Sequence, residues 1–66
     1  MRDVIEVKRV YEYSLLEIPG VVGVAADIRT NEVVVFTETR EDCLKLPRII
    51  EGYRVRCKPI GIIKPL

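Results

Sequence analysis

The segment from Ile18 to Glu38 places the strongest constraint on how this chain folds. It contains a Pro19-Gly20 break, a strand-like run from Val21 to Ile28, a polar turn from Arg29 to Glu32, and a second β-branched run from Val33 to Thr37. Two such runs joined by a short polar turn predict a β-hairpin. The segments on either side are then expected to cover the hairpin.

The segment before the hairpin has the pattern of an amphipathic helix. Asp3 and Glu6 have the three-residue spacing of a capping box, which marks a helix start. Residues that share one helical face follow at the expected intervals, interrupted by one serine: Val7, Val10, Tyr11, Ser14, Leu15 and Ile18. Because Pro19 disfavours helical dihedral angles at the residue before it, we expect the helix to end near Glu17.

The segment after the hairpin suggests a second, interrupted helix and a last strand. Thr39 and Asp42 repeat the capping-box spacing, so a helix is predicted from Arg40 to Lys45, with a further turn that begins at Pro47 and ends at Gly52. Residues 53–58 then alternate strictly between uncharged and basic residues, which indicates a half-buried strand at a sheet edge.

These elements predict an α+β fold with the order α-β-β-α-β. We expect residues 1–66 to form a single small domain, a two-layer sandwich with a three-stranded sheet, two helices on one face, and an apolar C-terminal tail over residues 59–66. The run from Val33 to Phe36 is apolar without alternation, so it requires cover on both faces, whereas two helices cover only one.

The uncovered sheet surface predicts self-association, most simply as a homodimer through the open sheet face or edge. Burial of apolar surface contributes about 25 cal/mol per Å², so several apolar side chains left in water lose several kcal/mol of stabilisation. That loss is large compared with the stability of so small a domain. The residues expected at this interface are Val21, Gly23, Ala25, Val33, Val35, Ile62 and Ile63.

Composition and charge exclude several classes of protein. Residues 1–39 carry four basic and seven acidic side chains, and residues 40–66 carry seven basic and three acidic ones, so the two halves attract each other. The run from Pro19 to Ala26, which has no polar side chain, is too short to cross a membrane, and no apolar leader follows Met1. We expect a soluble cytoplasmic protein, with a Glu-, Lys- and Arg-rich composition typical of thermophiles.

Cys43 and Cys57 are the two cysteines of the chain. If a helix and a strand both lead away from a turn at Gly52, the two cysteines lie at similar distances from that turn and could come into contact. Two alternatives remain open: a disulfide, or a pair of buried reduced thiols. Without histidine or a close C-x-x-C, a metal site is not expected. Catalysis by Cys43 is not expected either, because the chain has no histidine to act as its base, and the chain is predicted not to be an enzyme.

The basic row Arg54, Arg56 and Lys58 on the last strand provides the alternative function, binding to nucleic acid. Tyr53 lies on the opposite side of that strand, so the row lacks an aromatic stacking platform, and the balanced charge argues against a general nucleic-acid binder. A charged edge that blocks strand addition is the structural explanation of the same residues.

Two resemblances bear on these expectations. The segments Ile18-Pro19-Gly20-Val21-Val22-Gly23-Val24, Val33-Val34-Val35-Phe36 and Ile50 to Val55, together with the Ile60 to Leu66 ending, resemble the small N-terminal module that precedes some trypsin-like peptidase domains. That resemblance spans most of the chain through short apolar motifs. It implies an autonomous module without the peptidase activity, because no histidine is present for a catalytic triad.

The second resemblance is to heavy-metal-associated domains. It rests on Pro19-Gly20-Val21, Val24-Ala25-Ala26-Asp27, Val33-Val34-Val35 and Gly52-Tyr53-Arg54-Val55. Those domains are ferredoxin-like and bind soft metals through an M-x-C-x-x-C loop after their first strand. This chain lacks that strand and that loop, so the resemblance implies a ferredoxin-like sandwich that is missing a strand, and it does not imply metal transfer.

The sequence therefore predicts a noncatalytic module that acts by protein association and uses no cofactor. Its expected partner is a second copy, with another protein as an open possibility. Nucleic-acid binding is the alternative, and a ligand- or metal-binding ferredoxin-like module is the third hypothesis.

Overall fold

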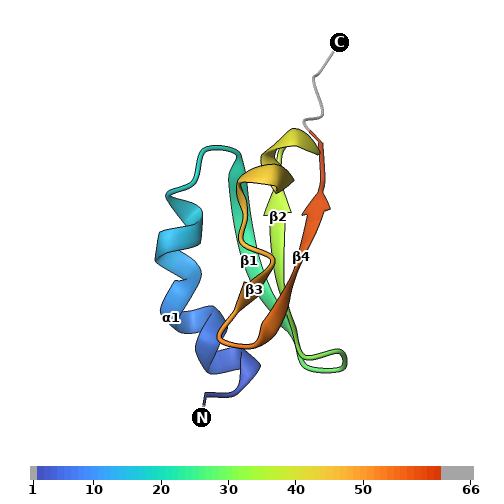
Figure 1. Ribbon diagram of the computed structural model, residues 1–66. Helices are drawn as coiled ribbons and strands as arrows, with labels where there is room; N and C mark the ends of the chain where they lie inside the picture. The colour runs from blue at the N-terminus through green and yellow to red at the C-terminus, as the bar shows by residue number, and fades with distance from the viewer. Residues whose placement is uncertain (1, 62–66) are drawn as a thin grey trace.

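The computed structural model describes residues 2–61 and contains one α-helix and one mixed sheet (Figure 1). The sheet has four strands in the order β1-β2-β4-β3. Along the chain the elements are the helix α1 (Val4–Leu16), the strands β1 (Val21–Asp27) and β2 (Glu32–Thr37), the short 3-10 helix η1 (Glu41–Lys45), and the strands β3 (Ile49–Ile50) and β4 (Tyr53–Pro59). β2 pairs antiparallel with β1 and parallel with β4, and β3 pairs antiparallel with β4.

The first helix forms as its local signals predict. Asp3 is the N-cap, and its carboxylate accepts a hydrogen bond of 2.8 Å from the backbone N–H of Glu6. This satisfies one of the amide groups that the first helical turn leaves without a partner. The helix ends at Leu16, ahead of Pro19, and Gly20 turns the chain into β1 with a φ of +93°.

The hairpin also forms where it is expected. β1 and β2 are antiparallel, with Ala25 opposite Val34. In the turn, the Asp27 carboxylate accepts hydrogen bonds from the backbone N–H groups of Arg29 and Thr30, at 3.0 and 3.4 Å, and Asn31 takes the left-handed conformation with a φ of 55°. The side chain of Asp27 thus stabilises the turn that follows it.

The predicted second helix and three-stranded sheet are wrong. The Thr39–Asp42 capping contacts are present, but they open only η1, because Pro47 forces Leu46 into an extended conformation with a ψ of 147°. Ile49 and Ile50 then pair with Arg54 and Tyr53 as β3, through a two-residue turn in which Glu51 and Gly52 both have positive φ. Over the described residues the fold is therefore α+β with one α-helix and a fourth, two-residue strand, and the predicted α-β-β-α-β order of a ferredoxin-like sandwich is not found.

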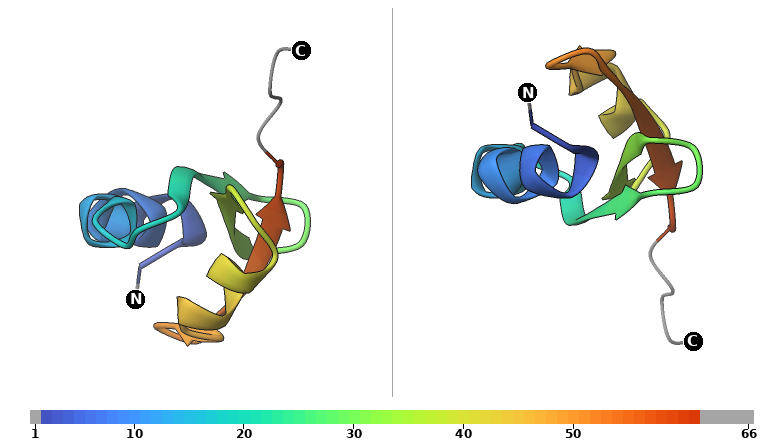
Figure 2. Two further views of the ribbon diagram at one scale, coloured as in Figure 1. Left: turned by 90° about the horizontal axis from the view of Figure 1, so that it is seen from above. Right: turned by 90° about the horizontal axis from the view of Figure 1, so that it is seen from below.

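The core lies between α1 and one face of the sheet. Figure 2 shows α1 and the η1–β3 segment on the same side, while no described helix covers the opposite side. The buried hydrophobic residues that form this core are Val4, Val7, Leu15, Val21, Val33, Val35 and Ile50. A register shift between Val21 and Gly23 forms a bulge, which turns Val21 toward α1 rather than toward the face of Gly23.

Candidate association surfaces

The open face of the sheet is formed by three cross-strand rows. The strand register places Gly23, Phe36 and Lys58 in one row, Ala25, Val34 and Arg56 in the next, and Asp27, Glu32 and Arg54 in the third. Cross-strand partners project to the same face of a sheet, so this surface carries three cations, two carboxylates and a small apolar centre.

Arg56 covers the apolar centre of the open face. Its guanidinium forms an ion pair of 3.0 Å with Asp27 on β1 and one of 3.7 Å with Glu32 on β2. To reach Asp27 from β4, the side chain must cross β2 between Glu32 and its own register partner Val34, which is only 6% exposed. The aliphatic stem of an arginine shields apolar surface in this way while its charged head stays near water. The second face of β2 is thus covered without a second layer of helices.

The structure distributes the expected interface residues over two sites. Val33 and Val35 are fully buried beneath α1, and the bulge places Val21 with them in the core, so these three residues do not lie on the open face. Gly23 and Ala25 do lie there, beside Phe36 and Val34. Ile62 and Ile63 fall outside the described residues. None of the large hydrophobic side chains that are strongly exposed in residues 2–61 belongs to the three rows of the open face.

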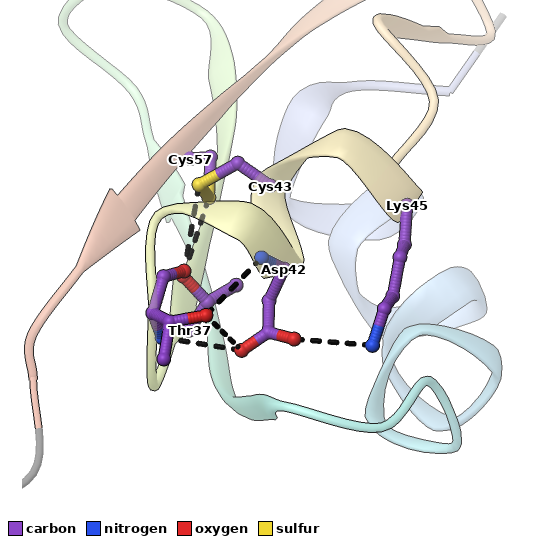
Figure 3. The surroundings of a disulfide bond; sticks show 6 residues. Thr37, Asp42, Cys43, Lys45 and Cys57 are labelled. Carbon is purple, nitrogen blue, oxygen red and sulfur yellow. Dashed lines mark hydrogen bonds and ion pairs between the residues drawn. A yellow bond between two sulfur atoms is a disulfide. The ribbon is translucent and has the colours of Figure 1, made fainter.

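A disulfide joins Cys43 of η1 to Cys57 of β4, with the two Cα atoms 5.7 Å apart (Figure 3). The buried hydroxyl of Thr37 lies 3.7 Å from the Cys43 sulfur and 3.5 Å from the Cys57 sulfur, and donates a hydrogen bond of 2.9 Å to the carbonyl of Thr39. The disulfide ties the crossover between the parallel strands β2 and β4 to the sheet. It also leaves neither sulfur available as a thiolate nucleophile.

Asp42 organises the chain beside this disulfide. Its carboxylate accepts hydrogen bonds from the Thr39 hydroxyl at 2.9 Å and the Thr39 N–H at 3.1 Å, and it pairs with Lys45 at 3.1 Å. The Thr39 hydroxyl, followed by Lys45, lowers the pKa of Asp42 below its ordinary value. In the same way, the turn amide of Arg29 and, to a smaller extent, the guanidinium of Arg56 lower the pKa of Asp27.

An apolar groove of about 420 Å³ separates α1 from the β3 segment. Among its lining residues, Glu51 pairs with Arg2 at 2.8 Å and raises the pKa of Tyr11 through a hydrogen bond. The residues that line it are Tyr11, Ser14, Leu15, Ile18, Pro47, Ile49, Ile50 and Glu51. A few polar groups at the rim of an apolar groove are typical of small-molecule and side-chain binding sites.

The outer side of α1 is the other apolar surface. Four large hydrophobic side chains of this helix are strongly exposed: Ile5, Val10, Tyr13 and Leu16. The same helix buries Val4, Val7 and Leu15 against the sheet, so it is apolar on more than one side. A helix of this kind is usually covered on both sides. Three of the four exposed residues lie outside the predicted stripe, so a search for that stripe alone could not find this surface.

Comparisons with known proteins found no matching family model, no matching curated protein and no matching solved structure. Over residues 2–61, no helix has the length and apolar character needed to cross a membrane. Over the same residues, no three histidine, cysteine, aspartate or glutamate side chains gather as a metal site would require.

Proposed function

We propose that this chain is a noncatalytic module that acts by associating with a second copy of itself. The observation that carries the proposal is the apolar outer side of α1, where Ile5, Val10, Tyr13 and Leu16 face solvent in the single chain. Covering a half-exposed isoleucine or leucine gains about 1 kcal/mol. For a domain of this size, a few such side chains represent a substantial part of its stability.

The open sheet face supports association less than the sequence suggested. Arg56 already covers Val34, and the rest of that face is a mixture of small residues and charges. The β1 edge of the sheet is a better candidate to extend the surface of the helix, because β1 is seven residues long and is uncharged from Val21 to Ala26. The opposite edge consists of the two-residue β3 and of the part of β4 beyond it, which carries Arg56 and Lys58. Long edges without charge are the ones that attract partners.

The mass of the protein in solution tests the proposal. Size-exclusion chromatography with light scattering, over a range of protein concentrations and at two salt concentrations, is expected to show twice the 7.6 kDa chain mass at high concentration. The disulfide lies within one chain and does not link two chains. Reductant therefore breaks no covalent link between the copies of a dimer. A single-chain mass at every concentration would overturn the proposal.

Two matched variants locate the surface. Leu16→Lys places a charge on the outer side of α1, and Ala25→Arg places one on the open sheet face. We expect L16K to weaken the dimer and A25R to leave it intact. The reverse result would move the interface to the sheet face that the sequence alone suggested, and circular dichroism of both variants checks that each remains folded.

A further inference from the structure

A second stripe of side chains runs along the outer side of α1. Ile5, Arg9, Glu12 and Leu16 follow one another at intervals of four, three and four residues. At about 100° per residue, these four positions fall within a sector of about 60°, well away from the buried stripe. Ile5 is 47% and Leu16 is 39% exposed. Both views in Figure 2 show no described element on the outer side of α1.

The spacing of the stripe is the same in both directions, and its two central residues carry charges of opposite sign. An apolar residue stands at each end, and a basic and an acidic residue stand between them at mirror-related positions. When two copies of α1 are laid antiparallel about the level midway between Val10 and Tyr11, Ile5 faces Leu16 of the second copy. In the same arrangement, Arg9 faces Glu12 of the second copy, and both contacts occur twice.

We infer that α1 pairs with α1 of a second copy in this antiparallel arrangement, about a two-fold axis. The inference rests on the proposed self-association and names the surface and the orientation. A parallel pair would place Arg9 against Arg9 and Glu12 against Glu12, whereas the antiparallel pair places opposite charges together. Such an interface is isologous, since each copy contributes the same patch.

The charges on the stripe are available for this contact. Among the described residues, no carboxylate lies within ion-pair distance of Arg9. Glu12 is held on the surface by Lys8, whose Nζ lies 2.7 Å from its carboxylate. The second copy thus supplies Arg9 with a carboxylate partner. Opposite charges across an interface mainly determine register and orientation.

The size of the stripe sets the expected strength of the pair. Ile5 and Leu16 are eleven residues apart, about 16 Å at ~1.5 Å per residue. A helix pair of that length buries less surface than the roughly 1,200 Å² that stable interfaces bury. The dimer is therefore in equilibrium with single chains, and its dissociation constant is measurable by sedimentation over a dilution series.

Charge exchange tests the orientation. Arg9→Glu brings two carboxylates together at each central contact, and Glu12→Arg brings two guanidinium groups together there, so each variant is expected to weaken the dimer at least tenfold. An equimolar mixture of R9E and E12R, or the doubly substituted R9E/E12R chain, restores opposite charges at both contacts. We expect dimerisation to return in both cases, and helical circular dichroism to be unchanged in every variant.

A covalent link provides an independent readout. Mixing Ile5→Cys with Leu16→Cys chains under mild oxidation is expected to give a dimer that is cross-linked between the two different variants, well above the level from either variant alone. If the wild-type chain dimerises but charge exchange has no effect and this cross-link does not form, the antiparallel pairing is wrong while self-association stands. If the wild-type chain never dimerises, both proposals fail.

Discussion

At the scale of single residues, Gly20 and Gly52 occupy similar backbone conformations in different surroundings. Both have positive φ, +93° and +86°, which alanine tolerates poorly. A Cβ atom on Gly20 would collide with the carboxylate of Asp42, whereas one on Gly52 would meet no atom within 4 Å. The pair therefore separates backbone strain from a steric clash.

We expect Gly52→Ala to lower the free energy of unfolding by about 1–2 kcal/mol, the cost of a left-handed residue with a side chain. Gly20→Ala should lose about 1–3 kcal/mol more, because Asp42 must move away from Thr39 and Lys45. Urea unfolding of the two variants beside the wild type measures both quantities. Equal losses would show that the Asp42 contact is unimportant.

The two aspartates with lowered pKa values predict how stability depends on pH. A carboxyl group whose pKa is lower in the folded chain than in the unfolded chain stabilises the fold above its unfolded value, here 3.8. That contribution is lost as the pH falls through the lower, folded pKa. We expect the urea midpoint to be steady from pH 7 to pH 5 and to decline below about pH 4.

Substitution of the same aspartates checks the source of this decline. In Asp27→Asn and Asp42→Asn, one of the titrating groups is absent, so the acid decline should be shallower than in the wild type, and shallowest in the double variant. Curves that run parallel to the wild type would assign the acid sensitivity to other carboxylates.

At the scale of elements, local signals predicted what local interactions determine. The Asp3 cap, Pro19 and the Asp27 turn act within a few residues of themselves, so α1 and the hairpin form where the sequence indicates. The last strand also forms over the expected residues, but the prediction that it lies at the sheet edge is wrong, because β4 lies between β2 and β3. The second helix failed because the five residues before Leu46 and Pro47 are too few to form a stable helix. β3 was missed because its turn uses Glu51 at positive φ, where Asn or Asp would have been the usual signal.

The disulfide is the element-scale constraint that the sequence left open. It closes a loop with a sequence separation of 14, for which the entropy of the unfolded chain predicts a stabilisation of about 3 kcal/mol. We expect reductant to lower the urea midpoint of the wild type strongly. A Cys43→Ser, Cys57→Ser double variant should start at the lower midpoint and not respond to reductant.

Alkylation of the native chain provides the control for that experiment. Iodoacetamide should add no mass before reduction and two adducts after it, because both sulfurs are in the disulfide. Adducts on the unreduced protein would show free thiols and reopen the alternative of two buried cysteines.

At the scale of the whole molecule, part of the charge difference between the two halves of the sequence is satisfied within one chain. Arg56 of the basic second half pairs with Asp27 and Glu32 of the acidic first half. The Arg2–Glu51 pair also joins the two halves, but with the opposite polarity. The sequence indicated that the halves attract each other. The alternation of residues along each strand could not show the bulge that buries Val21, or that the Arg56 side chain extends across β2 beside Val34. Those features depend on register across three strands.

The ion pairs of Arg56 with Asp27 and Glu32 bear on the nucleic-acid alternative. Asp27 and Glu32 stand beside the row of Arg54, Arg56 and Lys58, so a phosphate backbone that approaches the open face meets carboxylates as well as cations.

We expect the wild-type chain not to bind a single-stranded or duplex oligonucleotide at low ionic strength. An Asp27→Asn, Glu32→Gln variant should gain weak binding with a salt slope no steeper than about −3, the limit for three cations. Fluorescence anisotropy at several salt concentrations measures both proteins. Steeply salt-dependent binding by the wild type would instead make the open face a nucleic-acid surface, and the apolar side of α1 would then need a separate explanation.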